Sequence, residues 1–121
     1  LFAAVAQTGT TSTNIMTSPD GITWTQQTSP SLNDWKDITW SPELGIFCAV
    51  AETGVLDRIM TSADGITWID SSTGGAANPF DRSWKSVAWS PALGLFAACS
   101  IDGTGDRIMT SKSAHGFPYE S

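Results

Sequence analysis

The residue types that carry acid–base or nucleophilic chemistry are few in this chain and lie apart. The only histidine is His115, and no Gly-x-Ser-x-Gly turn surrounds it to present a serine nucleophile. The two cysteines, Cys48 and Cys99, lie inside apolar runs, which favours two buried free thiols over a disulfide framework. A zinc site needs three or four Cys, His or carboxylate ligands, and these residues do not supply them. We therefore expect no catalytic residue and no metal site.

One loop has acidic residues of the kind that a cation site uses. Asp102 and Asp106 flank Gly-Thr-Gly, so carboxylates and backbone carbonyls alternate, as they do in calcium loops. The other ligands of a calcium loop are missing, and the equivalent loops, TGTTSTN and TGVLDR, do not repeat the pattern. We therefore predict a plain turn. The chain also has no phosphate-binding or dinucleotide-binding glycine motif, so no cofactor is expected.

The composition favours a small acidic all-β domain. The chain has 121 residues, enough for one domain, and its twelve acidic and six basic residues give a net charge of −6. Thr, Ser, Gly and Trp are abundant, whereas strong helix formers are scarce. The acidity argues against a nucleic-acid partner and against an anionic membrane surface, because both attract clustered Lys and Arg. No apolar run approaches the ~18 residues that a membrane span needs.

The elements that position these side chains come from an internal repeat. Residues 15–24 read IMTSPDGITW, residues 59–68 read IMTSADGITW, and residues 108–111 read IMTS again. Residues 35–50 read WKDITWSPELGIFCAV, and residues 84–99 read WKSVAWSPALGLFAAC. Identities of this extent do not arise by chance, so the chain consists of three copies of one unit.

The copies divide the chain into one incomplete and two longer units. The opening LFAAVAQTG aligns with the segments that start at Ile46 and Leu95, so the chain begins inside a repeat and looks like a fragment or a processed product. We expect a partial unit over residues 1–30, a complete unit over 34–72 and a third unit with a degenerate end over 83–121.

Each complete unit is predicted to contain four short strands. In the middle copy, turn signals separate strands over residues 35–40, 46–51, 58–62 and 66–69. The strand over 46–51 is apolar on both faces, which is typical of a strand covered on both sides. On the first strand, strict alternation predicts that Trp35, Asp37 and Thr39 share one face and that Lys36, Ile38 and Trp40 share the other. In the third copy, residues 116–119 form a weak or edge strand because they include Pro118.

The predicted fold is all-β, built from four-stranded antiparallel β-propeller blades. The IMTS segments begin at Ile15, Ile59 and Ile108, so the repeat is 44 to 49 residues long. Four short strands in a repeat of that length are typical of a propeller, and a β-sandwich does not predict the repetition. A propeller closes with four to eight blades, and this chain supplies two and a half to three. Open end blades would expose apolar faces, so we expect the chain to bind itself. A homodimer would complete a ring of six blades, or of five if the partial blades merge.

The turns between the last two strands resemble a known family. Residues 18–24 read SPDGITW and residues 62–68 read SADGITW. This resembles the Asp-box (BNR) repeat of sialidase-like propellers, Ser-x-Asp-x-Gly-x-Thr-Trp, with one residue missing between Asp and Gly. The resemblance implies structural turn residues rather than an active site, and the third copy has lost both Asp and Trp. The residues to which it assigns this role are Ser18, Asp20, Gly21, Trp24, Ser62, Asp64, Gly65 and Trp68.

A sialidase-like hydrolase is the least favoured function. Sialidases use an arginine cluster, a Tyr/Glu nucleophile pair and an acidic residue. Arg58 and Arg107 occupy the same repeat position, so a structural role in each blade explains them. The remaining residues of these types are Arg82, Tyr119, Glu43, Glu52 and Glu120.

All six tryptophans fall at repeat-equivalent positions, which favours packing between blades over carbohydrate stacking. If one pair is exposed, we expect it to be Trp35 and Trp84, which begin a strand beside polar loops and would then bind a ligand. We therefore predict a structural or interaction module that assembles with itself. A lectin-like propeller that binds a glycan, or one that binds another protein, is the alternative.

Overall fold

The structure is a computed structural model and describes residues 1–7, 12–55, 57–70, 82–105, 107–113 and 116–120. Within these ranges every regular element is a β-strand, which confirms the all-β prediction. No helix in the described ranges is long and apolar enough to cross a membrane. Two residues considered above, His115 and Asp106, lie outside the described residues, as does most of the loop that follows residue 70.

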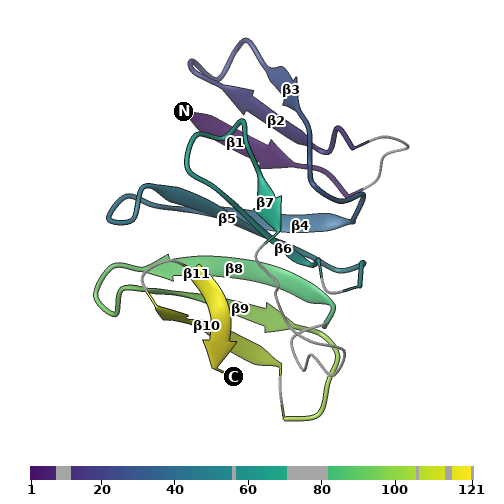
Figure 1. Cartoon of the computed structure of the whole chain (residues 1–121), viewed down its shortest axis with the longest axis vertical. Helices are drawn as coiled ribbons and strands as arrows, with labels where there is room; N and C mark the ends of the chain where they lie inside the picture. The colour runs from purple at the N-terminus through teal and green to yellow at the C-terminus, as the bar shows by residue number, and fades with distance from the viewer. Residues whose placement is uncertain (8–11, 56, 71–81, 106, 114–115, 121) are drawn as a thin grey trace.

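The strands form three antiparallel sheets in which chain neighbours pair with each other (Figure 1). Sheet A contains β1 (Phe2–Val5), β2 (Ile15–Ser18) and β3 (Thr25–Gln27). Sheet B contains β4 (Trp35–Ser41), β5 (Ile46–Ala51), β6 (Ile59–Ser62) and β7 (Ile69–Asp70). Sheet C contains β8 (Trp84–Ser90), β9 (Leu95–Ser100), β10 (Ile108–Ser113) and β11 (Gly116–Glu120). As predicted, the strand that includes Pro118 lies at a sheet edge.

Sheet B lies between the other two sheets, so the order of the sheets in space follows the chain (Figure 1). One buried cluster joins sheets A and B, and a second joins sheets B and C. Strand β5 contributes to both, because Ala49 and Ala51 face sheet A whereas Cys48 and Val50 face sheet C. The prediction that this strand is covered on both sides is confirmed. Sheets B and C approach each other mainly through β4 and β8.

The predicted alternation along β4 is wrong at its first residue. Trp35 pairs with Ala51 and Asp37 pairs with Val50, so two residues of β4 advance against one of β5. This bulge turns Trp35 onto the face of Ile38, and both side chains belong to the cluster between sheets A and B. The same shift recurs in β8, which places Trp84 with Val87.

The last strand of the complete unit is shorter than predicted. It covers Ile69–Asp70 rather than residues 66–69. The amides of Ile66 and Thr67 both donate to Asp64 Oδ1 at 2.8 Å, so they are not available to the strand ladder. Because Asp64 binds these amides, the strand begins only at Ile69.

Candidate functional site

The turns over residues 18–24 and 62–68 are built by side-chain hydrogen bonds to the backbone. In the second copy, Ser62 Oγ accepts from the amide of Gly65 at 2.8 Å and donates to Asp64 Oδ1 at 3.1 Å. The indole of Trp68 donates to the Gly65 carbonyl at 2.9 Å. Gly65 has a φ of 77°, a conformation that an L side chain rarely adopts. The turn therefore requires each of these residue types.

The first copy repeats this geometry. Asp20 Oδ1 accepts from the amides of Ile22 and Thr23 at 2.8 Å each, and Ser18 Oγ accepts from the amide of Gly21 at 2.8 Å. Trp24 donates to the Gly21 carbonyl at a longer 3.3 Å. These side chains are committed to their own turn, and no group from another element converges on them to form a reaction centre in the described residues.

The carboxylates of Asp20 and Asp64 are held in their charged form. Hydrogen bonds from the amides of Thr23 and Ile22 lower the pKa of Asp20, and those of Thr67 and Ile66 lower the pKa of Asp64. An acidic group with a lowered pKa is a poor proton donor at neutral pH. The electrostatics of the two turns thus fit a structural turn rather than acid catalysis.

In the third copy, the serine at the start of the turn makes a different hydrogen bond. Ser111 occupies the position of Ser18 and Ser62, and its Oγ accepts from the amide of Phe96 at 2.8 Å. The serine therefore remains buried and bonded without the aspartate that follows it in the other copies.

The arginines singled out by the sialidase resemblance clamp loops. Arg58 Nε donates to the Gly54 carbonyl at 2.9 Å, and Arg107 Nε donates to the Gly103 carbonyl at 2.8 Å. The same contact in two repeats fits the structural role expected from their equivalent positions. Arg82 lies just before β8, and the side chains of Tyr119 and Glu120 lie outside the described part of the chain.

The two glutamates whose side chains are described join neighbouring sheets. Glu52 pairs with Lys36 of its own sheet at 2.6 Å and with Lys85 of sheet C at 2.5 Å. Hydrogen bonds from Lys36 and Lys85 lower its pKa from 4.5 to about 2. Glu43 Oε2 accepts from the indole of Trp89 at 2.6 Å. Both carboxylates therefore stabilise the junction between sheets B and C.

The expectation that Trp35 and Trp84 form the exposed pair is wrong. Their side chains are 1% and 0% exposed, because the bulge that begins each strand turns the indole into the space between two sheets. Neither ring is accessible to a ligand, so the carbohydrate-binding hypothesis loses the residues on which it rested. Nothing in the sequence marks the bulge, since Lys36 and Lys85 look like ordinary strand residues.

The two cysteines have different environments. Cys48 is fully buried, and burial raises the pKa of its thiol, as expected for an inert core cysteine. Cys99 is a free thiol on the exposed side of β9, so the prediction that it is buried is wrong. Its position in the repeat is that of Val5 and Val50, which face another sheet. Cys99 is exposed because no described sheet covers that face of sheet C.

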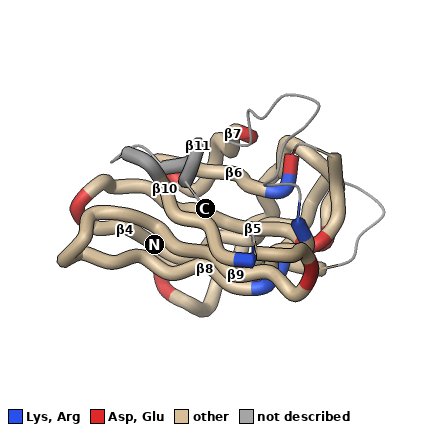
Figure 2. Tube along the Cα trace, turned by 90° about the horizontal axis from the view of Figure 1, so that it is seen from below, with Lys and Arg blue, Asp and Glu red and all other residues tan. Residues whose placement is uncertain are grey.

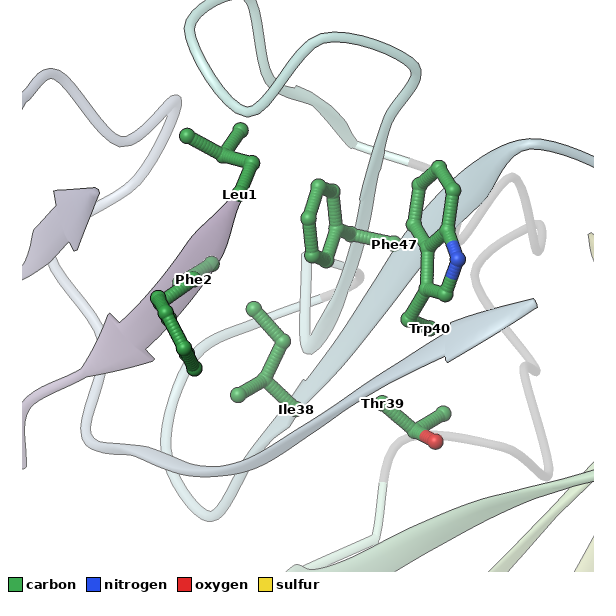
Figure 3. Close-up of a pocket in the computed structure, with 7 residues that line it drawn as sticks. Leu1, Phe2, Ile38, Thr39, Trp40 and Phe47 are labelled. Atoms are coloured by element: carbon green, nitrogen blue, oxygen red, sulfur yellow. The ribbon is translucent and has the colours of Figure 1, made fainter. Parts of the chain in front are cut away.

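A hollow of about 200 Å³ lies where sheet A meets sheet B (Figure 3). None of the residues that line it has an acidic, basic or thiol side chain. Trp40 stands at its edge with 41% of its surface exposed and packs on Phe47 with ring centroids 4.5 Å apart. The lining residues are Leu1, Phe2, Ala3, Ile38, Thr39, Trp40 and Phe47.

The corresponding space between sheets B and C is filled by the chain itself. There Leu44 and Ile46 pack beside Trp89, the equivalent of Trp40, and Glu43 accepts the indole hydrogen bond. The hollow is a packing space at the junction between sheets A and B.

The two outer faces of the stack are also candidate surfaces. The methionine face of a sheet is the side on which an Ala pairs with a Met across two strands. The isoleucine face is the opposite side, on which a Val or Cys pairs with an Ile. The methionine faces carry the pairs Ala4–Met16, Ala49–Met60 and Ala98–Met109 in sheets A, B and C. The isoleucine faces carry the pairs Val5–Ile15, Val50–Ile59 and Cys99–Ile108.

These faces pair in one way at both junctions. Ile15 of sheet A shares a buried cluster with Met60 of sheet B, and Ile59 of sheet B shares one with Met109 of sheet C. Each junction thus joins the isoleucine face of one sheet to the methionine face of the next. Within the described ranges, no sheet covers the methionine face of sheet A or the isoleucine face of sheet C. The sequence predicted that the end sheets would expose apolar faces, but it did not assign the residues of each open face, because that depends on which side of a sheet has a neighbour.

Within the described ranges, no group of three His, Cys, Asp or Glu side chains lies close enough together to hold a metal ion. No family model matches the chain. No curated protein is similar enough to the chain to count as a relative.

Proposed function

We propose that the chain is a self-assembling module of β-propeller blades with a structural or interaction role. The observation that carries this proposal is the repeated junction: the same two kinds of sheet face meet twice within one chain. A sheet that stacks on copies of itself leaves an unsatisfied face at each end, and such faces favour association.

Three further features support blades arranged around an axis. Each sheet is an antiparallel meander of three or four short strands, which is the content of a propeller blade. The two complete sheets are closest at their first strands, β4 and β8, as blades are where they converge on a central channel. The turns of sheets A and B have the side-chain hydrogen bonds expected from the Asp-box resemblance.

The assembly that fits these features best is a homodimer that forms a six-bladed ring. Two chains supply six sheets, which lies within the range of closed propellers. A head-to-tail contact closes into a ring when its rotation allows and otherwise extends into an open fibre.

Small-angle X-ray scattering tests the proposal on the unmodified chain. A ring of two chains predicts a particle of twice the 12.8 kDa chain mass. Its radius of gyration would be about 18 Å, the value of a compact particle of that length. A scattering mass that grows without limit, with a rod-like profile, would instead indicate an open stack. A profile of separate single chains would contradict self-assembly.

A further inference from the structure

We propose that the isoleucine face of sheet C in one copy binds the methionine face of sheet A in a second copy. This inference rests on the proposed self-assembly and names the surfaces that carry it. It predicts that Ile108 of one chain lies against Met16 of the next, as Ile15 lies with Met60 and Ile59 with Met109 inside the chain.

The methionine face of sheet A is an interface without its partner. Phe2, Met16 and Trp24 are 56%, 37% and 38% exposed. Their equivalents in sheet B are Phe47, Met60 and Trp68, and each is at most 7% exposed because sheet A covers them. Ala4 is exposed beside Met16, whereas Ala49 is fully buried beside Met60. The same residue types are thus present in sheet A, and only the covering sheet is missing.

The isoleucine face of sheet C also lacks the covering sheet that its equivalents in sheets A and B have. Ile108 is 63% exposed, whereas Ile15 and Ile59 are fully buried. Its cross-strand neighbour Cys99 is exposed, whereas Val50 beside Ile59 is buried. A cysteine is no larger than the valine that it replaces, so the face keeps the apolar character and the shape needed at a junction.

The pairs that define the two open faces contain no charged residue. Figure 2, seen from the sheet C side, shows most charged residues near the ends of the strands and uncharged stretches between them. The two open faces lie on opposite outer sheets of the stack (Figure 1), so one copy cannot cover both of its own faces while a second copy can.

A second copy is the occupant that the chain itself specifies. The two internal junctions always join unlike faces, and each chain has one unlike face left at either end. Two copies therefore satisfy both faces of each chain with contacts that this sequence already makes twice. A contact between two sheet C faces, or between two sheet A faces, would be a pairing that the chain makes nowhere.

Complementary charged variants test this pairing. Met16→Glu places a carboxylate on the open face of sheet A, and Ile108→Lys places an ammonium on the open face of sheet C. Each position is exposed in the single chain, so both variants should fold, which circular dichroism verifies. An unpaired buried charge should weaken self-association about a hundredfold or more in each variant alone. Val55→Lys, at an exposed apolar loop position outside both faces, is the matched control.

The decisive sample is the equimolar mixture of the two variants, measured by sedimentation velocity. We expect each variant alone to sediment as a single chain and the mixture to recover a two-chain particle. In that particle one junction joins two unmodified faces. The other junction brings the carboxylate introduced by Met16→Glu beside the ammonium introduced by Ile108→Lys, so neither charge is buried alone. The Val55→Lys control should sediment like the unmodified chain.

The remaining outcomes separate the two proposals. If the unmodified chain is a single chain at every concentration, self-assembly itself is wrong. If the unmodified chain associates and both variants still associate, the open faces are not the interface. If only one variant dissociates, or if the mixture does not recover, the contact does not join these two unlike faces. The last two results overturn this inference and leave self-assembly standing.

Discussion

Ile59 of sheet B and Met109 of sheet C lie in one buried cluster although a full repeat separates them along the chain. Ile15 and Met60 have the same relationship one repeat earlier. This relationship gives each sheet a direction, with one face that covers and one face that is covered. It also leaves the chain with one open face of each kind, from which the self-assembly account follows.

The buried Trp84 and the partly exposed Trp40 should differ strongly in how much each stabilises the fold. Trp84 fills the space between sheets B and C, so Trp84→Ala should lower the free energy of unfolding by about 3–5 kcal/mol. Trp40→Ala removes a ring that is partly exposed and should cost about 1 kcal/mol. Urea unfolding of dilute protein measures both. If Trp84→Ala does not fold, Trp84→Phe keeps the comparison measurable, and equal losses at the two positions would contradict the account.

Glycine should matter more in the turn over residues 62–68 than in the turn over residues 18–24. Both Gly21 and Gly65 have positive φ, so alanine should cost about 1 kcal/mol at either position. A Cβ at Gly65 would also lie 2.8 Å from Leu1 Cδ2 and 3.3 Å from Thr17 Cγ2, whereas at Gly21 the nearest atom is 3.5 Å away. Leu1 is exposed and can turn away, whereas Thr17 is buried, so Gly65→Ala should cost slightly more than Gly21→Ala in urea unfolding. The reverse order would show that sheet A does not press on this turn.

Acid should weaken the junction between sheets B and C through Glu52. Its pKa is about 2 in the folded chain and 4.5 without its lysine partners. Because the folded pKa is the lower one, the stabilisation is fully present above pH 4.5 and is lost as the pH falls from 4.5 towards 2.

Glu52→Gln should therefore melt at a lower temperature than the unmodified chain at pH 7 and should lose less on acidification through that range. Thermal unfolding followed at several pH values measures the difference. Asp20 and Asp64, whose pKa values are also lowered, still titrate in the variant and leave a residual acid dependence. Parallel pH curves for the two proteins would contradict a role for Glu52.

Cys99 should report on the open face of sheet C. In dilute folded protein, iodoacetamide should modify Cys99 and leave the buried Cys48 intact, and mass spectrometry of peptides distinguishes them. Modification of Cys99 should slow as the protein concentration rises, because a second copy then covers the thiol. The Met16→Glu chain is the control, since it should lose this concentration dependence. Equal reaction of both thiols in folded protein would contradict the position of β5 between two sheets.

The sequence predicted most strands because the repeat shows which features recur. The Ser-Pro turn recurs in the second and third copies and the Asp-Gly turn recurs in the first and second copies, and these turns separate the strands. The alternation rule failed at Trp35, because a bulge adds one residue and no residue type marks it. The predicted bounds of the last strand of the complete unit were also wrong, because the carboxylate of Asp64 binds two amides that a strand would otherwise use.

Exposure was harder to predict than secondary structure. Val50 and Cys99 occupy one repeat position in similar apolar runs, yet only Val50 is buried. Trp24 and Trp68 also share a position, and Trp68 alone is covered by a neighbouring sheet. Burial at these positions depends on whether a neighbouring sheet is present, which no local pattern encodes. The sequence therefore predicted exposed apolar faces at the end sheets, and the arrangement of the sheets identified the residues that form them.

The most direct test of the central claim is the solution mass of the unmodified chain, measured by light scattering over a range of concentrations. The account predicts a mass that rises from the 12.8 kDa of one chain to a plateau at twice that value. A constant mass of 12.8 kDa at every concentration would contradict it, because the two open faces would then be stable in water without a second copy.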